Sequence, residues 1–81
     1  MFEGVKMTLV DMKQNKSYQI SKIITNDDVL RERLVALGIC EGTKTALLEK
    51  SLDKSTIAIL SNNTRIALRA TEAKEVFIKE V

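Results

Sequence analysis

The chain has 81 residues, which is enough for one domain and too few for two. Its hydrophobic fraction of 44% and charged fraction of 30% are typical of a globular protein and exclude a disordered tail. The formal net charge is only +2, and basic and acidic residues alternate along the chain. This composition lacks the concentrated positive charge that nucleic-acid backbones select, so we expect no nucleic-acid partner.

Histidine is absent, and Cys40 is the only cysteine. The chain therefore lacks the commonest general base and transition-metal ligand, and we expect no catalytic residue, no metal site and no cofactor. A lone cysteine forms no internal disulfide, which fits a reducing compartment. No apolar run approaches the roughly 20 residues that span a bilayer, and no signal-peptide pattern opens the chain. We therefore expect a cytoplasmic protein without direct membrane insertion.

The first part of the chain divides into an extension and the start of a domain. Residues 1–6 carry no clear pattern and are interpreted as an N-terminal extension that could be disordered. Residues 7–81 are interpreted as one domain. Within it, residues 7–12 read as an extended arm, and residues 14–17 are rich in the polar types that form turns.

Residues 17–24 form the first predicted strand. Tyr18 and Ile20 share one face, but Ile23 is out of phase with them. We therefore expect a bulge near residues 21–22, or a bend of the strand there. A bent strand is what a small barrel needs in order to close.

One amphipathic helix is predicted over residues 26–37. Thr25 or Asn26 would be its N-cap, and Gly38 would end it in a left-handed conformation. Residues 31–33 are charged and are expected to face water. The helix carries one apolar stripe at helical spacing, formed by Leu30, Leu34 and Leu37.

The second half of the chain alternates short apolar runs with turn residues. Asn62 and Asn63 suit a tight hairpin because asparagine tolerates positive φ. Residues 71–74 read as a short helical turn. The order of strand, helix, three strands, short turn and strand predicts a mainly β fold, a meander closed into a small barrel with the helix over one open end. The later predicted strands cover residues 43–49, 55–60, 64–69 and 75–80.

An ordered set of short motifs runs through the domain. The pattern R-L-x-x-L-G-I-x-x-G begins at Arg33 and ends at Gly42. Residues 8–12 precede it, and Ile-Ala-Leu-Arg at 66–69 follows it, before Glu-Ala and a terminal Val-Phe-Ile. In this order and spacing, the motifs resemble the ferrous iron transport protein A (FeoA) family over about residues 7–80.

The resemblance implies an SH3-like barrel in the bacterial cytoplasm. Such proteins are expected to assist a membrane transporter of ferrous iron that carries a GTP-hydrolysing domain. A similar barrel ends some metal-dependent transcriptional repressors, but 81 residues leave no room for a DNA-binding helix-turn-helix. The chain departs from the family where Asn15 and the asparagine hairpin replace glycine, and where Glu41 stands in a position that often holds proline.

A corner after the helix and the end of one strand are the expected contacts with the transporter. The corner is also explained as a helix stop followed by a turn, with Cys40 as a spectator thiol. The residues named for partner binding are Leu37, Gly38, Ile39, Cys40, Glu41, Gly42 and Arg69. Arg69 is expected to pair with a carboxylate and not with a nucleotide, because the chain has no P-loop motif.

The sequence therefore favours a non-enzymatic accessory protein of ferrous iron uptake that binds and modulates the transporter. An SH3-like domain that senses a metal or a peptide is the alternative. A small nucleic-acid-binding barrel is a third hypothesis. The oligomeric state is left open.

Overall fold

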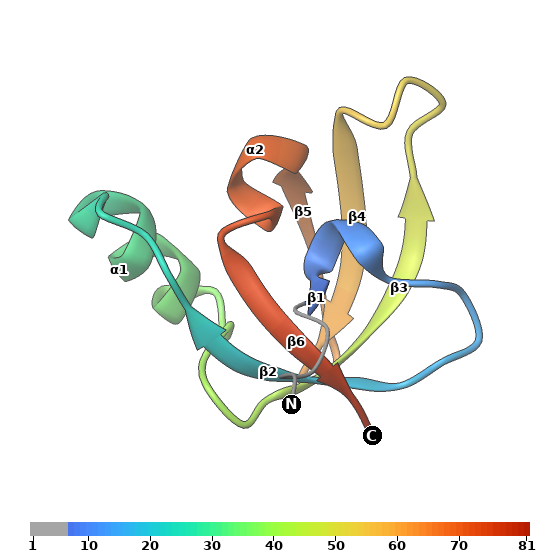
Figure 1. Ribbon diagram of the computed structural model, residues 1–81, viewed down its shortest axis with the longest axis horizontal. Helices are drawn as coiled ribbons and strands as arrows, with labels where there is room; N and C mark the ends of the chain where they lie inside the picture. The colour runs from blue at the N-terminus through green and yellow to red at the C-terminus, as the bar shows by residue number, and fades with distance from the viewer. Residues whose placement is uncertain (1–6) are drawn as a thin grey trace, which may run out of the picture.

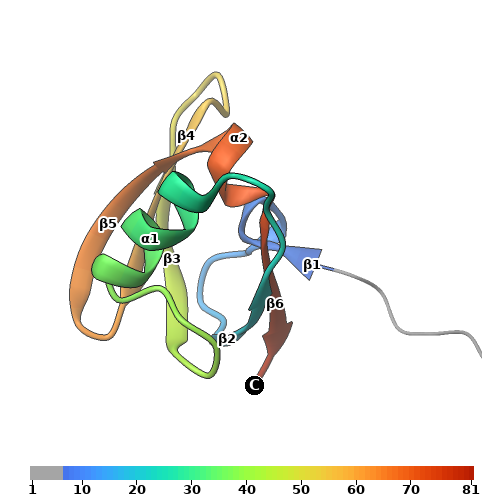
Figure 2. The same cartoon turned by 90° about the vertical axis from the view of Figure 1, so that its left-hand side faces the viewer.

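The computed structural model describes residues 7–81, so the predicted extension over residues 1–6 lies outside the described part of the chain. Six strands form one antiparallel sheet in the order β1-β6-β2-β3-β4-β5 (Figure 1). The sheet curls, so that β2 and β6 lie on one side of the core while β4 and β5 lie on the other (Figure 2). The mainly β architecture predicted from the sequence is confirmed. In chain order the elements are β1 (Met7–Thr8), η1 (Leu9–Asp11), β2 (Tyr18–Ile23), α1 (Asp28–Ala36), β3 (Lys44–Lys50), β4 (Thr56–Ser61), β5 (Thr64–Arg69), α2 (Ala70–Ala73) and β6 (Val76–Glu80).

The core lies inside this curl and follows the alternation of the strands. On the β4–β5 hairpin, Ile57 pairs with Leu68 and Ile59 pairs with Ile66, and each of the four side chains is at most 4% exposed. Directly opposed residues share a face of the sheet, so the hairpin presents one continuous apolar face to the core. The two strands lie within one or two residues of the ranges 55–60 and 64–69 predicted from the sequence.

The predicted irregularity in the first long strand is present. The register of β2 against β6 shifts between Ile20 and Lys22, which turns the end of β2 relative to its start. A second shift occurs in β3 between Leu47 and Glu49. No phase change in the sequence indicated it, because both sides of β3 carry apolar residues there.

The extended arm predicted over residues 7–12 is wrong beyond Thr8. Only β1 is extended, and η1 follows it as a single 3-10 turn. The Asp11 carboxylate accepts a hydrogen bond of 2.9 Å from the backbone N–H of Thr8, which favours the turn. Turning the chain here buries Leu9 and Met12, which are 0% and 1% exposed.

Helix α1 begins two residues later than predicted. Its N-cap is Asp27, whose carboxylate accepts a hydrogen bond of 3.1 Å from the Leu30 N–H. Thr25 does not cap the helix. Its hydroxyl instead donates to Glu75 at 2.9 Å and accepts from the Asp27 N–H at 3.1 Å. No helix in the described part of the chain is long and apolar enough to cross a membrane.

The loop between β3 and β4 is organised around one carboxylate. Asp53 Oδ1 accepts hydrogen bonds from the hydroxyl of Ser51 at 2.7 Å and from the hydroxyl of Ser55 at 2.8 Å. The backbone N–H of Ser55 donates to the same oxygen at 3.1 Å. All three bonds favour the ionised form, and together they lower the pKa of Asp53 to about 2.

Replacing Asp53 with asparagine tests the effect of this carboxylate on stability. The folded-state pKa lies below the ordinary value of 3.8, so its contribution to stability is present above that value and is lost as the pH falls toward about 2. We expect a difference in urea midpoint between wild type and Asp53→Asn at neutral pH that shrinks through this window. A difference that is constant with pH would contradict the assignment.

Candidate functional site

The corner that follows α1 is a tightly hydrogen-bonded helix end. The Ile39 N–H donates to the Leu34 carbonyl at 2.9 Å, and the Gly38 N–H donates to the Val35 carbonyl at 3.0 Å. This pair of bonds is the Schellman arrangement, which requires the left-handed conformation that Gly38 adopts at φ +93°. Ile39 is fully buried and belongs to the same core cluster as Leu34 of the helix.

The rest of the corner is bound to β2. The Gly42 N–H donates to the Ile20 carbonyl at 2.8 Å, and the Gln19 side chain donates to the Gly42 carbonyl at 3.0 Å. Gly42 has φ +87°, another left-handed position that favours glycine. The corner is therefore held at both ends, and the residues between these ends are positioned by the scaffold.

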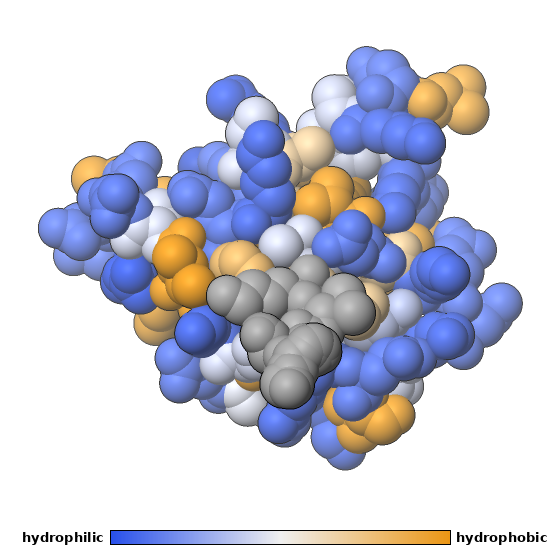
Figure 3. All heavy atoms as spheres, viewed as in Figure 1, coloured by the Kyte–Doolittle hydropathy of each residue, from blue (hydrophilic) through white to orange (hydrophobic). Residues whose placement is uncertain are grey.

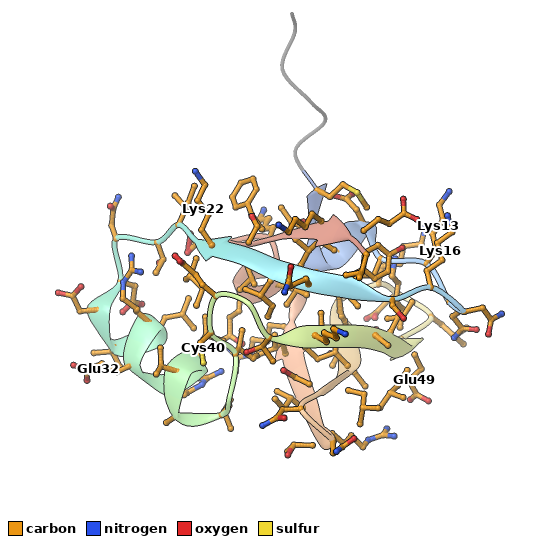
Figure 4. All side chains as sticks on the ribbon, turned by 90° about the horizontal axis from the view of Figure 1, so that it is seen from below. Lys13, Lys16, Lys22, Glu32, Cys40 and Glu49 are labelled. Carbon is orange, nitrogen blue, oxygen red and sulfur yellow. The ribbon has the colours of Figure 1, made fainter. Side chains whose placement is uncertain are left out.

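An open hollow of about 220 Å³ lies between this corner, the helix and the end of β2. Its walls are largely apolar, although they include the cationic side chain of Arg31 and the carboxylate of Glu41. Figure 3 shows apolar atoms gathered on the side of the molecule where Figure 1 draws α1 and the end of β2. Figure 4 shows Cys40 on the loop between α1 and β3. We call this feature the α1–β3 hollow, and it is lined by Ile23, Arg31, Val35, Cys40 and Glu41.

Arg31 forms a fixed wall of the hollow. Its guanidinium donates to the carbonyl of Ile23 at 3.3 Å and to the carbonyl of Thr25 at 3.0 Å. Arg31 is exposed, as predicted, but its guanidinium also satisfies backbone carbonyls at the end of β2. These carbonyls lie at and just beyond the end of β2, where β3 no longer pairs with it, since β3 pairs with β2 only at Tyr18 and Gln19.

Apolar side chains remain exposed around the hollow. Val35 is 52% exposed, and Ile24, next to Ile23, is 48% exposed. Exposed apolar residues are common singly, but Val35 lines a depression whose walls are largely apolar, which makes it a candidate contact. The arrangement can hold an apolar group of a partner, with hydrogen bonds or ion pairs at Arg31 and Glu41.

Only part of the predicted contact set lies at this hollow. Cys40 and Glu41 line it, and Leu37 is 39% exposed nearby in sequence, so Leu37 is not a full member of the buried stripe. Ile39 is buried, and the two glycines act through their backbone. The sequence did not predict that Ile23, Arg31 and Val35 contribute to the site. The one indication in the sequence was that Ile23 is out of phase with the alternation of Tyr18 and Ile20.

Arg69 lies elsewhere, at the end of β5 beside α2 (Figure 1). Its predicted pairing with a carboxylate is wrong among the described residues, because Glu72 is taken by Arg33 instead. The Arg33 Nη2 lies 2.9 Å from both Glu72 oxygens, whereas Arg69 contributes only its backbone N–H, at 3.2 Å from Glu72 Oε1. The structure therefore does not bring Arg69 together with the corner.

Within the described part of the chain, no group of three or more His, Cys, Asp or Glu residues could hold a metal ion. The features present are a curled antiparallel sheet, a helix against its open side, and an exposed apolar hollow with fixed walls. These features define an SH3-like β domain with a small exposed hollow.

Comparison with known proteins identifies the family. The model of the FeoA domain matches residues 7–80. A relative from Helicobacter pylori, named "Putative Fe(2+) transport protein A", is 39% identical over 74 residues, which are 91% of this chain and 95% of the relative. The chain belongs to the FeoA family, as the motifs predicted.

Solved structures show the same fold. The FeoA of Stenotrophomonas maltophilia, crystallised with zinc and described as a procaryotic SH3 domain protein, is 26% identical. The match covers 90% of this chain and 89% of that one, with a TM-score of 0.78. A manganese-dependent transcriptional repressor matches 98% of this chain with 43% of its own length, at 11% identity and a TM-score of 0.86. The SH3-like fold is therefore shared with metal-dependent repressors.

Proposed function

We propose that this chain is a cytoplasmic accessory protein of bacterial ferrous iron uptake. It docks on the cytoplasmic part of a GTP-hydrolysing membrane transporter of ferrous iron and modulates its activity. The observation that carries the proposal is the α1–β3 hollow, an exposed and largely apolar depression that is lined in part by Val35, Cys40 and Glu41 of the motif that marks the family. The Fe(2+) transport name of the Helicobacter pylori relative supports the iron context.

The hollow suits docking because it is formed before a partner arrives. Its wall residue Arg31 is fixed by two backbone carbonyls, and its loop is fixed by Gly38 and Gly42. A preformed surface loses little conformational entropy on binding, so more of the burial energy of an inserted apolar group appears as affinity. Val35 lines this surface from the helix, and an apolar side chain that becomes buried in such a contact has a large effect on affinity.

Replacing Val35 with aspartate should weaken capture of the transporter's purified cytoplasmic domains. Placing a carboxylate in an apolar contact adds a desolvation cost, and we expect at least a ~10-fold loss of affinity. The matched control is Val29→Asp, on the same helix, where the side chain is 76% exposed and does not line the hollow. Equal affinities of the two variants would contradict docking at the hollow.

The same pair of variants can be tested in cells. In a strain that lacks this protein, uptake of ferrous iron under iron limitation should be restored by wild type and by Val29→Asp, but poorly by Val35→Asp. Normal uptake in the deletion strain would overturn the proposed function itself.

A regulatory domain that senses a metal or a peptide is the second candidate. It is favoured by the fold shared with the manganese-dependent repressor and by the zinc in the Stenotrophomonas maltophilia structure. Titration with ferrous or manganous ion, followed by NMR, separates the two candidates. Shifts confined to carboxylate-bearing residues would favour sensing over docking.

A further inference from the structure

The outward face of the β6–β2 part of the sheet carries an unusual set of residues. Strand register places Thr8 opposite Phe77, and Phe77 opposite Lys22. The inward residue Ile78, opposite both Met7 and Ile20, is only 5% exposed. Because neighbouring positions along a strand alternate between faces, this row of three lies on the outside.

A second outward row lies one repeat further along the strands. Lys79 is opposite Gln19, and Gln19 is opposite Lys44 on β3. These two rows thus hold three exposed lysines and no carboxylate. We call this surface the basic strip, and it consists of Lys22, Lys44 and Lys79 with Phe77 and Gln19 between them.

No carboxylate of residues 7–81 forms an ion pair with a lysine of the strip. The ion pairs among the described residues are those of Lys16 with Glu80, Arg33 with Glu72 and Arg65 with Glu49, and none includes a lysine of the strip. Neighbouring strands are about 4.8 Å apart, so Lys79 and Lys44 are separated by about 10 Å at their Cα atoms. The charge is therefore spread over the surface and is not concentrated at one point.

Other lysines lie on the same side of the molecule as Lys22. Figure 4 shows Lys13 and Lys16 on its upper side with Lys22, whereas the labelled carboxylates Glu32 and Glu49 lie on its lower side. A net charge of +2 therefore does not exclude a locally positive face. Among the ion pairs of the described residues, that of Lys16 with Glu80, at 3.0 Å, neutralises part of this side.

We propose that the basic strip rests on the surface of an anionic phospholipid bilayer. Lipid phosphates are numerous, mobile and spread over a plane, which suits separate lysines on flexible stems. Phe77 is half-buried in the strip and offers an apolar ring to the interface between headgroups and acyl chains. The strip is a peripheral contact and requires no membrane-spanning segment.

The position of the strip relates it to the α1–β3 hollow. Lys22 directly precedes Ile23, which lines the hollow. A molecule that rests on the membrane through the strip therefore holds the hollow beside the bilayer, within reach of a membrane partner. This inference goes beyond the docking function, and it can be tested without the transporter.

The test is sedimentation of the full chain with lipid vesicles. Wild type should bind mixed vesicles of phosphatidylglycerol and phosphatidylcholine at low salt. Its binding should be much weaker to vesicles of pure phosphatidylcholine, and much weaker to the mixed vesicles at high salt. The triple variant Lys22→Glu, Lys44→Glu, Lys79→Glu should lose at least ~100-fold in partitioning to anionic vesicles. Circular dichroism and the urea midpoint verify that the variant is folded.

A second triple variant controls for net charge. Lys54→Glu, Lys74→Glu and Arg65→Glu change the charge by the same amount at exposed positions outside the strip. This control should bind anionic vesicles much better than the strip variant. Equal loss in the two variants, or no binding of wild type to anionic vesicles, would overturn the proposal. Binding of wild type to single-stranded DNA as tightly as to the vesicles would also overturn it, because the strip would then not select a lipid surface.

Discussion

Replacing Leu34 with alanine should lower the free energy of unfolding by about 2–5 kcal/mol. Leu34 is 0% exposed and belongs to the same buried cluster as Ile39 and Leu30. Its carbonyl also accepts the hydrogen bond that ends the helix, so the side chain packs where the backbone is already fixed. Closely packed surroundings of this kind relax little around a cavity. Truncation here should therefore lower the free energy of unfolding much more than truncation at a surface position.

The control for Leu34 is Val29→Ala on the same helix. Val29 is 76% exposed, and we expect its truncation to change stability by less than about 0.5 kcal/mol. Urea denaturation of the three proteins measures both values. Similar midpoints for all three would show that α1 does not pack against the sheet, and would remove the buried support of the α1–β3 hollow.

Most of the β architecture could be predicted because its signals are local. The alternation of Ile57, Ile59, Ile66 and Leu68 specifies one buried face, and the phase change at Ile23 indicates the irregularity of β2. The asparagine hairpin was also readable, since Asn62 and Asn63 adopt φ values of 52° and 64°. Each of these features depends on residues that are close in sequence.

The errors arose where distant residues decide the local structure. Thr25 is a good N-cap by type, but the Glu75 carboxylate, 50 positions away, binds its hydroxyl and leaves the cap to Asp27. Arg69 has carboxylates nearby in sequence, but Arg33 from α1 takes Glu72. Neither competition can be read from one segment alone.

The candidate site was only half visible for the same reason. Its loop belongs to a recognisable motif, and this made Cys40 and Glu41 candidates. The opposite wall comes from the end of β2 and from α1, in Ile23, Arg31 and Val35. These three residues are brought together by the bulge of β2 and by the two hydrogen bonds of Arg31, which only a three-dimensional arrangement shows.

The second large effect is expected on β4, a strand that is paired on both sides. Ile59 is fully buried and lies between Leu47 of β3 and Ile66 of β5. Its neighbour Leu60 points to the other face and is 36% exposed. The two side chains are isomers on one strand, so truncating them removes the same number of carbon atoms. A difference between the two losses of stability therefore reports which face of the sheet each residue occupies.

Ile59→Ala should cost about 2–5 kcal/mol, because a central strand cannot close the cavity without disturbing both of its neighbours. Leu60→Ala should cost less than about 1 kcal/mol, because it removes only a half-exposed contact. Urea denaturation of both variants, fitted with one shared slope, gives the comparison directly. A one-residue slip in register would exchange the two positions. Equal losses, or a larger loss for Leu60, would therefore contradict the pairing of β4 with β3 and β5.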